Sequence, residues 1–201
     1  MTRRRLYLAR IALLASCAVA ATSAQAKFVA IFEEIGSNVV EVGGGTFDVT
    51  DLTLGETGAI STPAVLPQLA FFDSGDDQAP VDTYLTVTTP SNFGTGARTN
   101  ASSSSGDVVG ISSLGLLNLP LGYVSGTPLS DTSTYLDATF ASLGMTPGSY
   151  VYSWGSADHA DSLTLEIVAV PEASTWAMML LGLAGLSFAG YRASRQTTLA
   201  S

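Results

Sequence analysis

Short segments in which polar and apolar residues alternate recur between Lys27 and Pro171, and this pattern restricts the fold more than any other feature. Residues 162–167, Ser-Leu-Thr-Leu-Glu-Ile, alternate throughout, and residues 46–54 alternate in their first part. A period of two places successive side chains on opposite faces of a β-strand. Residues 83–88 have the β-branched and aromatic composition of a strand, and further strands are predicted at residues 28–35, 38–42, 107–111 and 150–154.

Clusters of turn-forming residues separate these segments: Gly-Gly-Gly at 43–45, Asp-Ser-Gly-Asp-Asp at 73–77, Thr-Pro-Ser-Asn at 89–92 and Pro-Gly at 147–148. Residues 100–105, which include four consecutive serines, are predicted to be a solvated loop. Outside the two ends of the chain, no stretch shows helical periodicity. We therefore predict an all-β fold, an antiparallel β-sandwich with a jelly-roll-like arrangement, for residues 27–169.

The charge of the chain is distributed unevenly. Residues 27–171 contain 16 acidic residues against two basic ones, Lys27 and Arg98, which gives this part a formal net charge of −14. Such a surface would repel the phosphate backbone of DNA or RNA, so the sequence argues against nucleic acid as a partner.

The N-terminal 26 residues have the pattern of a secretory signal peptide. A basic segment is followed by an apolar stretch at residues 11–21, and the small residues Ala24 and Ala26 mark a signal peptidase site. Export through the Sec translocon and a mature chain beginning at Lys27 are therefore predicted. Two alternatives are a twin-arginine route, which the arginines at 3–5 suggest, and lipidation at Cys17, which is the only cysteine and leaves with the signal.

A second apolar segment lies near the C-terminus. Residues 174–191 are apolar or small, close to the length that a helix needs to cross the hydrocarbon core of a bilayer. Arg192 and Arg195 follow it, and positive charge beside a membrane helix favours the cytoplasmic side. We expect a transmembrane helix with the body outside the cytoplasm and residues 196–201 as a cytoplasmic tail.

The residues before this segment are specific. Val170, Pro171, Glu172 and Ala173 precede Ser-Thr-Trp-Ala-Met-Met-Leu-Leu-Gly-Leu, and the arginines close the stretch at 170–195. Together they resemble the PEP-CTERM sorting signal of Gram-negative bacteria that produce exopolysaccharide, in which Pro-Glu-Pro, a hydrophobic helix and a basic end occur in this order. The second proline of the motif is Ala173 here. The resemblance implies cleavage near the motif by an exosortase, a membrane enzyme, and delivery to the cell surface.

A segment of the body adds to this resemblance. Residues 150–155, Tyr-Val-Tyr-Ser-Trp-Gly, and residues 161–165, Asp-Ser-Leu-Thr-Leu, are similar to the closing strands of a recurrent subgroup of such exported proteins. On a strand, Tyr150, Tyr152 and Trp154 would share one face, and we expect that face to point into the core.

Few residues of the body suggest chemistry. His159 is the only histidine and is expected in a surface loop, and one histidine without a mature cysteine cannot make a zinc site. The acidic pairs at 33–34, 48/51 and 76–77 could serve a glycosidase only if the fold placed two carboxylates across a cleft. Oxygen ligands suit calcium, so Asp73, Asp76 and Asp77 are the candidate ligands for a calcium ion; no other cofactor is predicted.

These features predict a non-enzymatic protein of the cell surface or extracellular matrix. It would be anchored briefly in the inner membrane, released by exosortase and associated with exopolysaccharide in a biofilm, as the resemblance implies. The alternative is an exported protein that binds carbohydrate with the help of calcium or acts on a polysaccharide.

Overall fold

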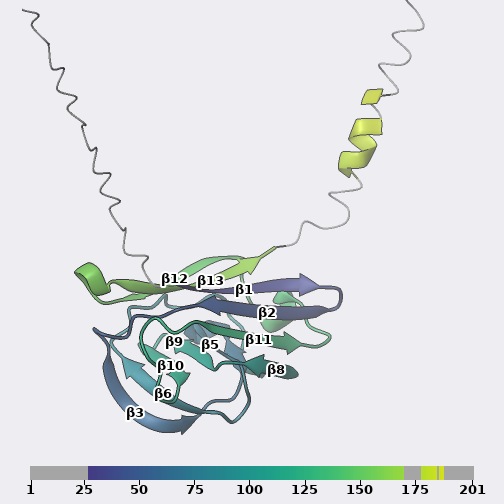
Figure 1. Cartoon of the computed structure of the whole chain (residues 1–201). Helices are drawn as coiled ribbons and strands as arrows, with labels where there is room; N and C mark the ends of the chain where they lie inside the picture. The colour runs from purple at the N-terminus through teal and green to yellow at the C-terminus, as the bar shows by residue number, and fades with distance from the viewer. Residues whose placement is uncertain (1–26, 170–177, 185, 188–201) are drawn as a thin grey trace, which may run out of the picture.

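The computed structural model describes residues 27–169, 178–184 and 186–187. Residues 27–169 fold into two β-sheets (Figure 1), which confirms the prediction of a mostly β, sandwich-like domain. The predicted signal peptide, the sorting motif at residues 170–173 and the two C-terminal arginines, Arg192 and Arg195, lie outside the described residues.

One sheet has six strands in the order β12-β13-β1-β2-β11-β8. Their bounds are β1 Lys27–Ile35, β2 Asn38–Gly45, β8 Ser103–Gly106, β11 Leu129–Tyr135, β12 Gly148–Trp154 and β13 Asp161–Val168. The first and last strands of the domain, β1 and β13, pair in parallel, whereas the other pairs of the sheet are antiparallel. The expected wholly antiparallel arrangement is therefore wrong at this one pair.

The other sheet has seven strands in the order β3-β6-β10-β9-β5-β4-β7, all antiparallel. Their bounds are β3 Thr53–Ile60, β4 Ala64–Leu66, β5 Phe71–Ser74, β6 Pro80–Leu85, β7 Thr99–Asn100, β9 Val109–Ser112 and β10 Leu116–Pro120. The short helices η1 Pro67–Leu69, α1 Phe140–Leu143 and η2 Ala157–His159 lie in the connections.

The core lies between the sheets and is rich in aromatic rings. On β1, alternate residues Phe28, Ala30 and Phe32 are buried. Phe28 stacks on Phe47 with ring centroids 4.9 Å apart, and Phe32 meets Phe72 of the other sheet edge to face at 6.0 Å. Offset-stacked and edge-to-face pairs of this kind add to the stabilisation from buried apolar area.

Three predicted segments were wrong in detail. The expected Gly-Gly-Gly turn at 43–45 is the end of β2, where these glycines pair with β1 and β11. Residues 46–52 are not a strand, because the chain turns away from the six-stranded sheet after Gly45; Phe47 is buried in the core, and Val49 and Leu52 pack against it partly buried. The serine-rich residues 100–105 are not a plain loop, because β8 pairs with β11 through Ser133↔Ser104 and its neighbours. The side chains of β8 are largely exposed, so backbone pairing rather than apolar burial forms this edge strand.

Residues 178–184 and 186–187 are helical, and their side chains are exposed. Within the part of the chain that is described, no helix reaches the length and apolar character required to cross a membrane.

Candidate functional site

Two acidic side chains lie buried between the sheets. Glu41 of β2 and Asp131 of β11 both point inward and are 0% and 5% exposed. In the register of the two strands Glu41 is opposite Ser133 and Gly43 is opposite Asp131, so the two acids are diagonal neighbours on one face. A β-carbon on Gly43 would lie 2.6 Å from Oδ1 of Asp131, so a side chain there would displace the carboxylate.

Serine hydroxyls connect this acid pair to the opposite sheet. The Ser74 hydroxyl of β5 donates to Oε2 of Glu41 and lies 2.8 Å from the Ser133 hydroxyl. Among the described residues, Oε1 of Glu41 and both carboxylate oxygens of Asp131 have no hydrogen-bond donor. The hydroxyl of Tyr135, on the same face of β11, is likewise without a partner there.

Burial determines the protonation of the pair. Desolvation and the nearby charge of Asp131 raise the pKa of Glu41 well above its ordinary value, and desolvation raises the pKa of Asp131 to about 6. Two buried carboxylates without a neighbouring cation repel each other, so burial and repulsion favour the protonated over the ionised form. The arrangement is thus a buried acid pair that takes up a proton in mildly acidic solution.

The three predicted calcium ligands do not converge. Asp73 is buried, and desolvation raises its pKa to about 6. Asp76 is exposed and accepts a hydrogen bond from the backbone N–H of Gly106 at 3.2 Å, and Asp77 accepts one from Gln78 at 3.1 Å. Across residues 27–169, 178–184 and 186–187, no group of three or more His, Cys, Asp or Glu residues is arranged to hold a metal ion.

A polar groove of about 300 Å³ runs along the edge of the sandwich beside β7 and β8. Its volume lies at the lower end of the range for small-molecule sites. The acidic turn and the serine-rich segment, which are far apart in the sequence, meet in it. Hydroxyl, amide and carboxylate groups line much of this groove, whose residues are Thr62, Pro63, Asp77, Asn100, Ala101, Ser102, Ser103 and Ser104.

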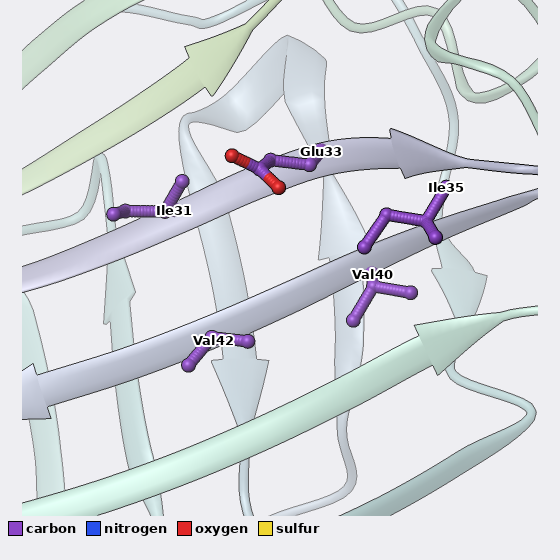
Figure 2. A pocket seen from close by; sticks show the side chains of 5 residues that line it. All are labelled: Ile31, Glu33, Ile35, Val40 and Val42. Atoms are coloured by element: carbon purple, nitrogen blue, oxygen red, sulfur yellow. The ribbon is translucent and has the colours of Figure 1, made fainter.

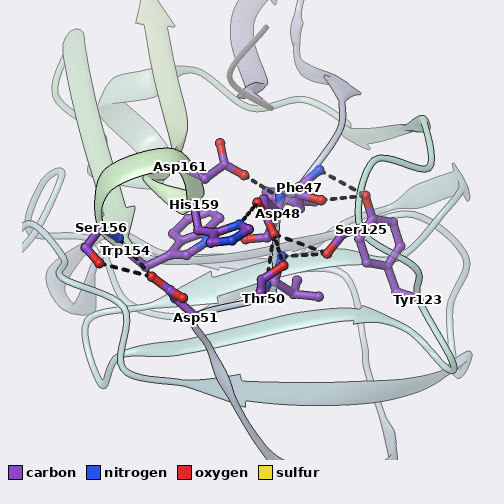
Figure 3. A network of polar contacts seen from close by, with 11 residues as sticks. Phe47, Asp48, Thr50, Asp51, Tyr123, Ser125, Trp154, Ser156, His159 and Asp161 are labelled. Atoms are coloured by element: carbon purple, nitrogen blue, oxygen red, sulfur yellow. Dashed lines mark hydrogen bonds and ion pairs between the residues drawn. The ribbon is translucent and has the colours of Figure 1, made fainter. Parts of the chain in front are cut away.

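His159 belongs to a polar network at one end of the sandwich, where three loops meet (Figure 3). Its Nδ1 lies 2.8 Å from Oδ2 of Asp48, and Oδ1 of Asp48 accepts hydrogen bonds from Thr50 and Ser125. Oδ2 of Asp161 accepts the backbone N–H of Asp48 at 2.6 Å. The network fastens the loop after β2 to the hairpin between β12 and β13.

In this network no serine hydroxyl is hydrogen-bonded to the imidazole of His159, so the histidine does not activate a nucleophile there. Ser125 donates to Asp48 and Ser156 donates to Asp51, so both serines of the network bind carboxylates rather than the imidazole. His159 is half exposed, as expected for a surface loop, but its pairing with Asp48 was not predicted. The contacts indicate a role in holding the loops together.

We expect Asp48→Asn to lower the pKa of His159 towards its ordinary value. The hydrogen bond and charge of Asp48 raise the pKa of His159. Partial burial tends to raise the pKa of Asp48, but hydrogen bonds from Thr50 and His159 outweigh it and lower that pKa to about 2. NMR titration of the His159 ring measures the shift, with Asp137→Asn as the matched control away from the network. An unchanged histidine pKa in Asp48→Asn would contradict the pairing.

The aromatic row of β12 faces the core, as expected. Tyr152 and Trp154 are buried and Tyr150 is partly buried. The Trp154 indole donates to the backbone carbonyl of Asp48 at 2.7 Å, and the Tyr152 hydroxyl donates to that of Ala70 at 2.7 Å. These rings anchor loops and do not form an exposed platform for sugars.

Known proteins offer no relative for this chain. No family model, no curated protein and no solved structure matches the chain.

Proposed function

We propose that this chain is an exported, non-enzymatic protein of the cell surface or extracellular matrix, delivered there by its C-terminal sorting signal. In this proposal the Sec translocon and signal peptidase act first, at Ala24 and Ala26. The helix at 174–191 then holds the chain in the inner membrane until exosortase cuts near Pro171 and Glu172. The body, with a jelly-roll-like strand arrangement, then associates with exopolysaccharide.

The position of the folded domain between the two predicted cleavage sites carries the proposal. Strand β1 begins at Lys27, directly after the predicted signal peptidase site, and β13 ends at Val168, just before Pro171. Among the described residues, cutting at both sites would therefore remove no strand and no core residue. A domain bounded in this way can be released intact, which is what a sorting pathway with two proteolytic steps requires.

The alternative is a calcium-dependent carbohydrate-binding or polysaccharide-active protein with the same export signals. The polar groove beside β7 and β8 favours it, because hydroxyl, amide and carboxylate groups can bind the hydroxyls of a sugar. A binding module would be stabilised against unfolding by calcium or saccharide, and an enzyme would lose turnover when a groove carboxylate such as Asp77 is replaced.

The intact mass of the protein from membrane and extracellular fractions of its host tests the proposal. We expect an extracellular form that begins at Lys27 and ends near Pro171 or Glu172, and its absence from a strain without exosortase. The variant Ala173→Pro, which restores the second proline of the motif, is the matched control and should be processed at least as completely. A form that reaches Ser201 and stays in the membrane with or without exosortase would refute sorting.

A further inference from the structure

The outer face of β1 and β2 is largely apolar, although none of the described elements covers it. We call Val29, Ile31, Ile35, Val40 and Val42 the apolar face; four of these side chains are from 36% to 56% exposed, and Val40 is partly buried. Ile31 is opposite Val42 in the strand register, and Glu33, opposite Val40, lies between Ile31 and Ile35 on the same face (Figure 2). Exposed apolar side chains grouped on one face in this way are typical of interaction sites.

The shape of this face suits side chains of a larger partner. The hollow formed by Ile31, Glu33, Ile35, Val40 and Val42 has a volume of about 130 Å³. Small-molecule sites are roughly 300–1,000 Å³, so this hollow is too small and shallow for such a ligand. An apolar helix that places one or two side chains in the hollow and others along the strands would fit it.

The same chain carries a second exposed apolar surface. Within the helical residues 178–184 and 186–187, six large apolar side chains are between 49% and 74% exposed, namely Met178, Met179, Leu180, Leu181, Leu183 and Leu186. Removing either surface from water would stabilise the chain through the hydrophobic effect. Two such surfaces on one chain are therefore expected to meet when the connection between them allows it.

The chain between the two surfaces is long enough for them to meet. Val168, the last residue of β13, pairs with Glu33 beside the apolar face, so the chain leaves the sheet where the face lies. The nine residues 169–177 can span up to about 30 Å, and a ten-residue helix is about 15 Å long, close to the span of residues 31–35 along a strand. A short connection of this kind gives an effective concentration on the order of millimolar.

Charge favours this segment over a second copy of the domain. Glu33 and Glu166 lie on the same side of the sheet as the apolar face, because Glu33 lines the hollow and Glu166 is opposite Ile31. In a face-to-face dimer these acids would meet the same acids of the other copy. The apolar segment is instead followed in sequence by Arg192 and Arg195, whose charges are complementary.

We propose that the C-terminal apolar helical segment, residues 178–184 and 186–187, docks on the apolar face of β1 and β2 when the chain is in water. The docked helix covers the face until the bilayer takes up the helix or cleavage removes it. This inference goes beyond sorting, since docking needs no exosortase and cleavage by exosortase needs no docking.

Disulfide trapping in the full-length chain tests the docking. Cys17 is the only cysteine, so the chain with Cys17→Ser has no thiol of its own. We expect the pair Val42→Cys and Leu180→Cys to form an intramolecular disulfide on mild oxidation in buffer without lipid or detergent, about tenfold or more faster than a matched pair. The matched pair is Leu114→Cys with Leu180→Cys, since Leu114 is 74% exposed in the turn between β9 and β10 of the other sheet.

Thiol labelling followed by intact mass measures the rate, and far-UV circular dichroism verifies that each variant is folded. The pair Ile35→Cys and Leu183→Cys is a second test on other exposed positions and should behave like the first. Equal rates in the Leu114 pair would overturn docking, because proximity through the connection alone would explain them. Disulfide-linked dimers that form faster from Val42→Cys alone than from Leu114→Cys alone would also overturn it, because the face would then bind a second copy.

Discussion

Replacing Phe47 by alanine is expected to lower the free energy of unfolding by about 3 to 5 kcal/mol, the range for truncating a buried aromatic ring. Phe47 is 0% exposed and contacts three other rings. Its centroid lies 4.9 Å from that of Phe28, 5.8 Å from Trp154 and 6.2 Å from Tyr123. The substitution would leave a cavity and loosen the loop whose polar network surrounds Asp48.

Urea unfolding followed by tryptophan fluorescence measures this effect. Trp154 lies beside the lost ring, so its emission in the folded state should also shift towards that of a more solvated indole. Leu114→Ala, in an exposed turn, is the control and should change stability by less than about 0.5 kcal/mol. A loss below about 1 kcal/mol for Phe47→Ala would show that the loop does not depend on this cluster.

Glu41→Gln is expected to stabilise the domain at pH 7 by about 1 to 3 kcal/mol. The pKa values of Glu41 and Asp131 are raised in the folded state, so the folded protein binds more protons than the unfolded one between about pH 4 and 6. Stability therefore falls as the pH rises through this window, and at pH 7, above the pKa of about 6 of Asp131, the buried charge of Asp131 destabilises the fold. A glutamine removes the repulsion, and its amide can donate to Asp131 while accepting from Ser74.

Unfolding free energies at pH 4 and pH 7 distinguish this account from a general effect of charge. The advantage of Glu41→Gln should shrink at pH 4, where the native pair holds its proton. Glu33→Gln removes one negative charge from the outer face and is the matched control, for which we expect almost no change. A destabilised Glu41→Gln at pH 7 would mean that the ionised carboxylate is stabilised by a group other than those described.

Clear alternation allowed much of the six-stranded sheet to be predicted. Strands β1, β2, β12 and β13 lie close to their predicted positions because large apolar residues mark one face or both. Strand β11, Leu-Ser-Asp-Thr-Ser-Thr-Tyr, was missed, since Asp131 and Ser133 occupy buried positions where the pattern requires apolar residues. Its partner β8 was missed for a related reason, because exposed serines give a strand no apolar signal.

The buried acid pair could not be read from the sequence. In β2 the valine at position 42 is 56% exposed while Glu41 is fully buried, the reverse of what the residue types suggest. Asp131 lies 90 positions further along and meets Glu41 only through the strand register. The polar groove and the pairing of Asp48 with His159 could not be predicted for the same reason, since both depend on contacts between segments that are distant along the chain.

The parallel pairing of β1 with β13 has a consequence for the order in which the domain folds. Lys27 is opposite Ser162 and Glu33 is opposite Val168. The edge of β1 that does not pair with β2 therefore has no strand partner until β13 is available. Contacts between the two ends of a domain have a high entropic cost and slow folding. A chain that becomes available from its N-terminus would thus stay incompletely folded until nearly all of the domain, up to β13, has been made.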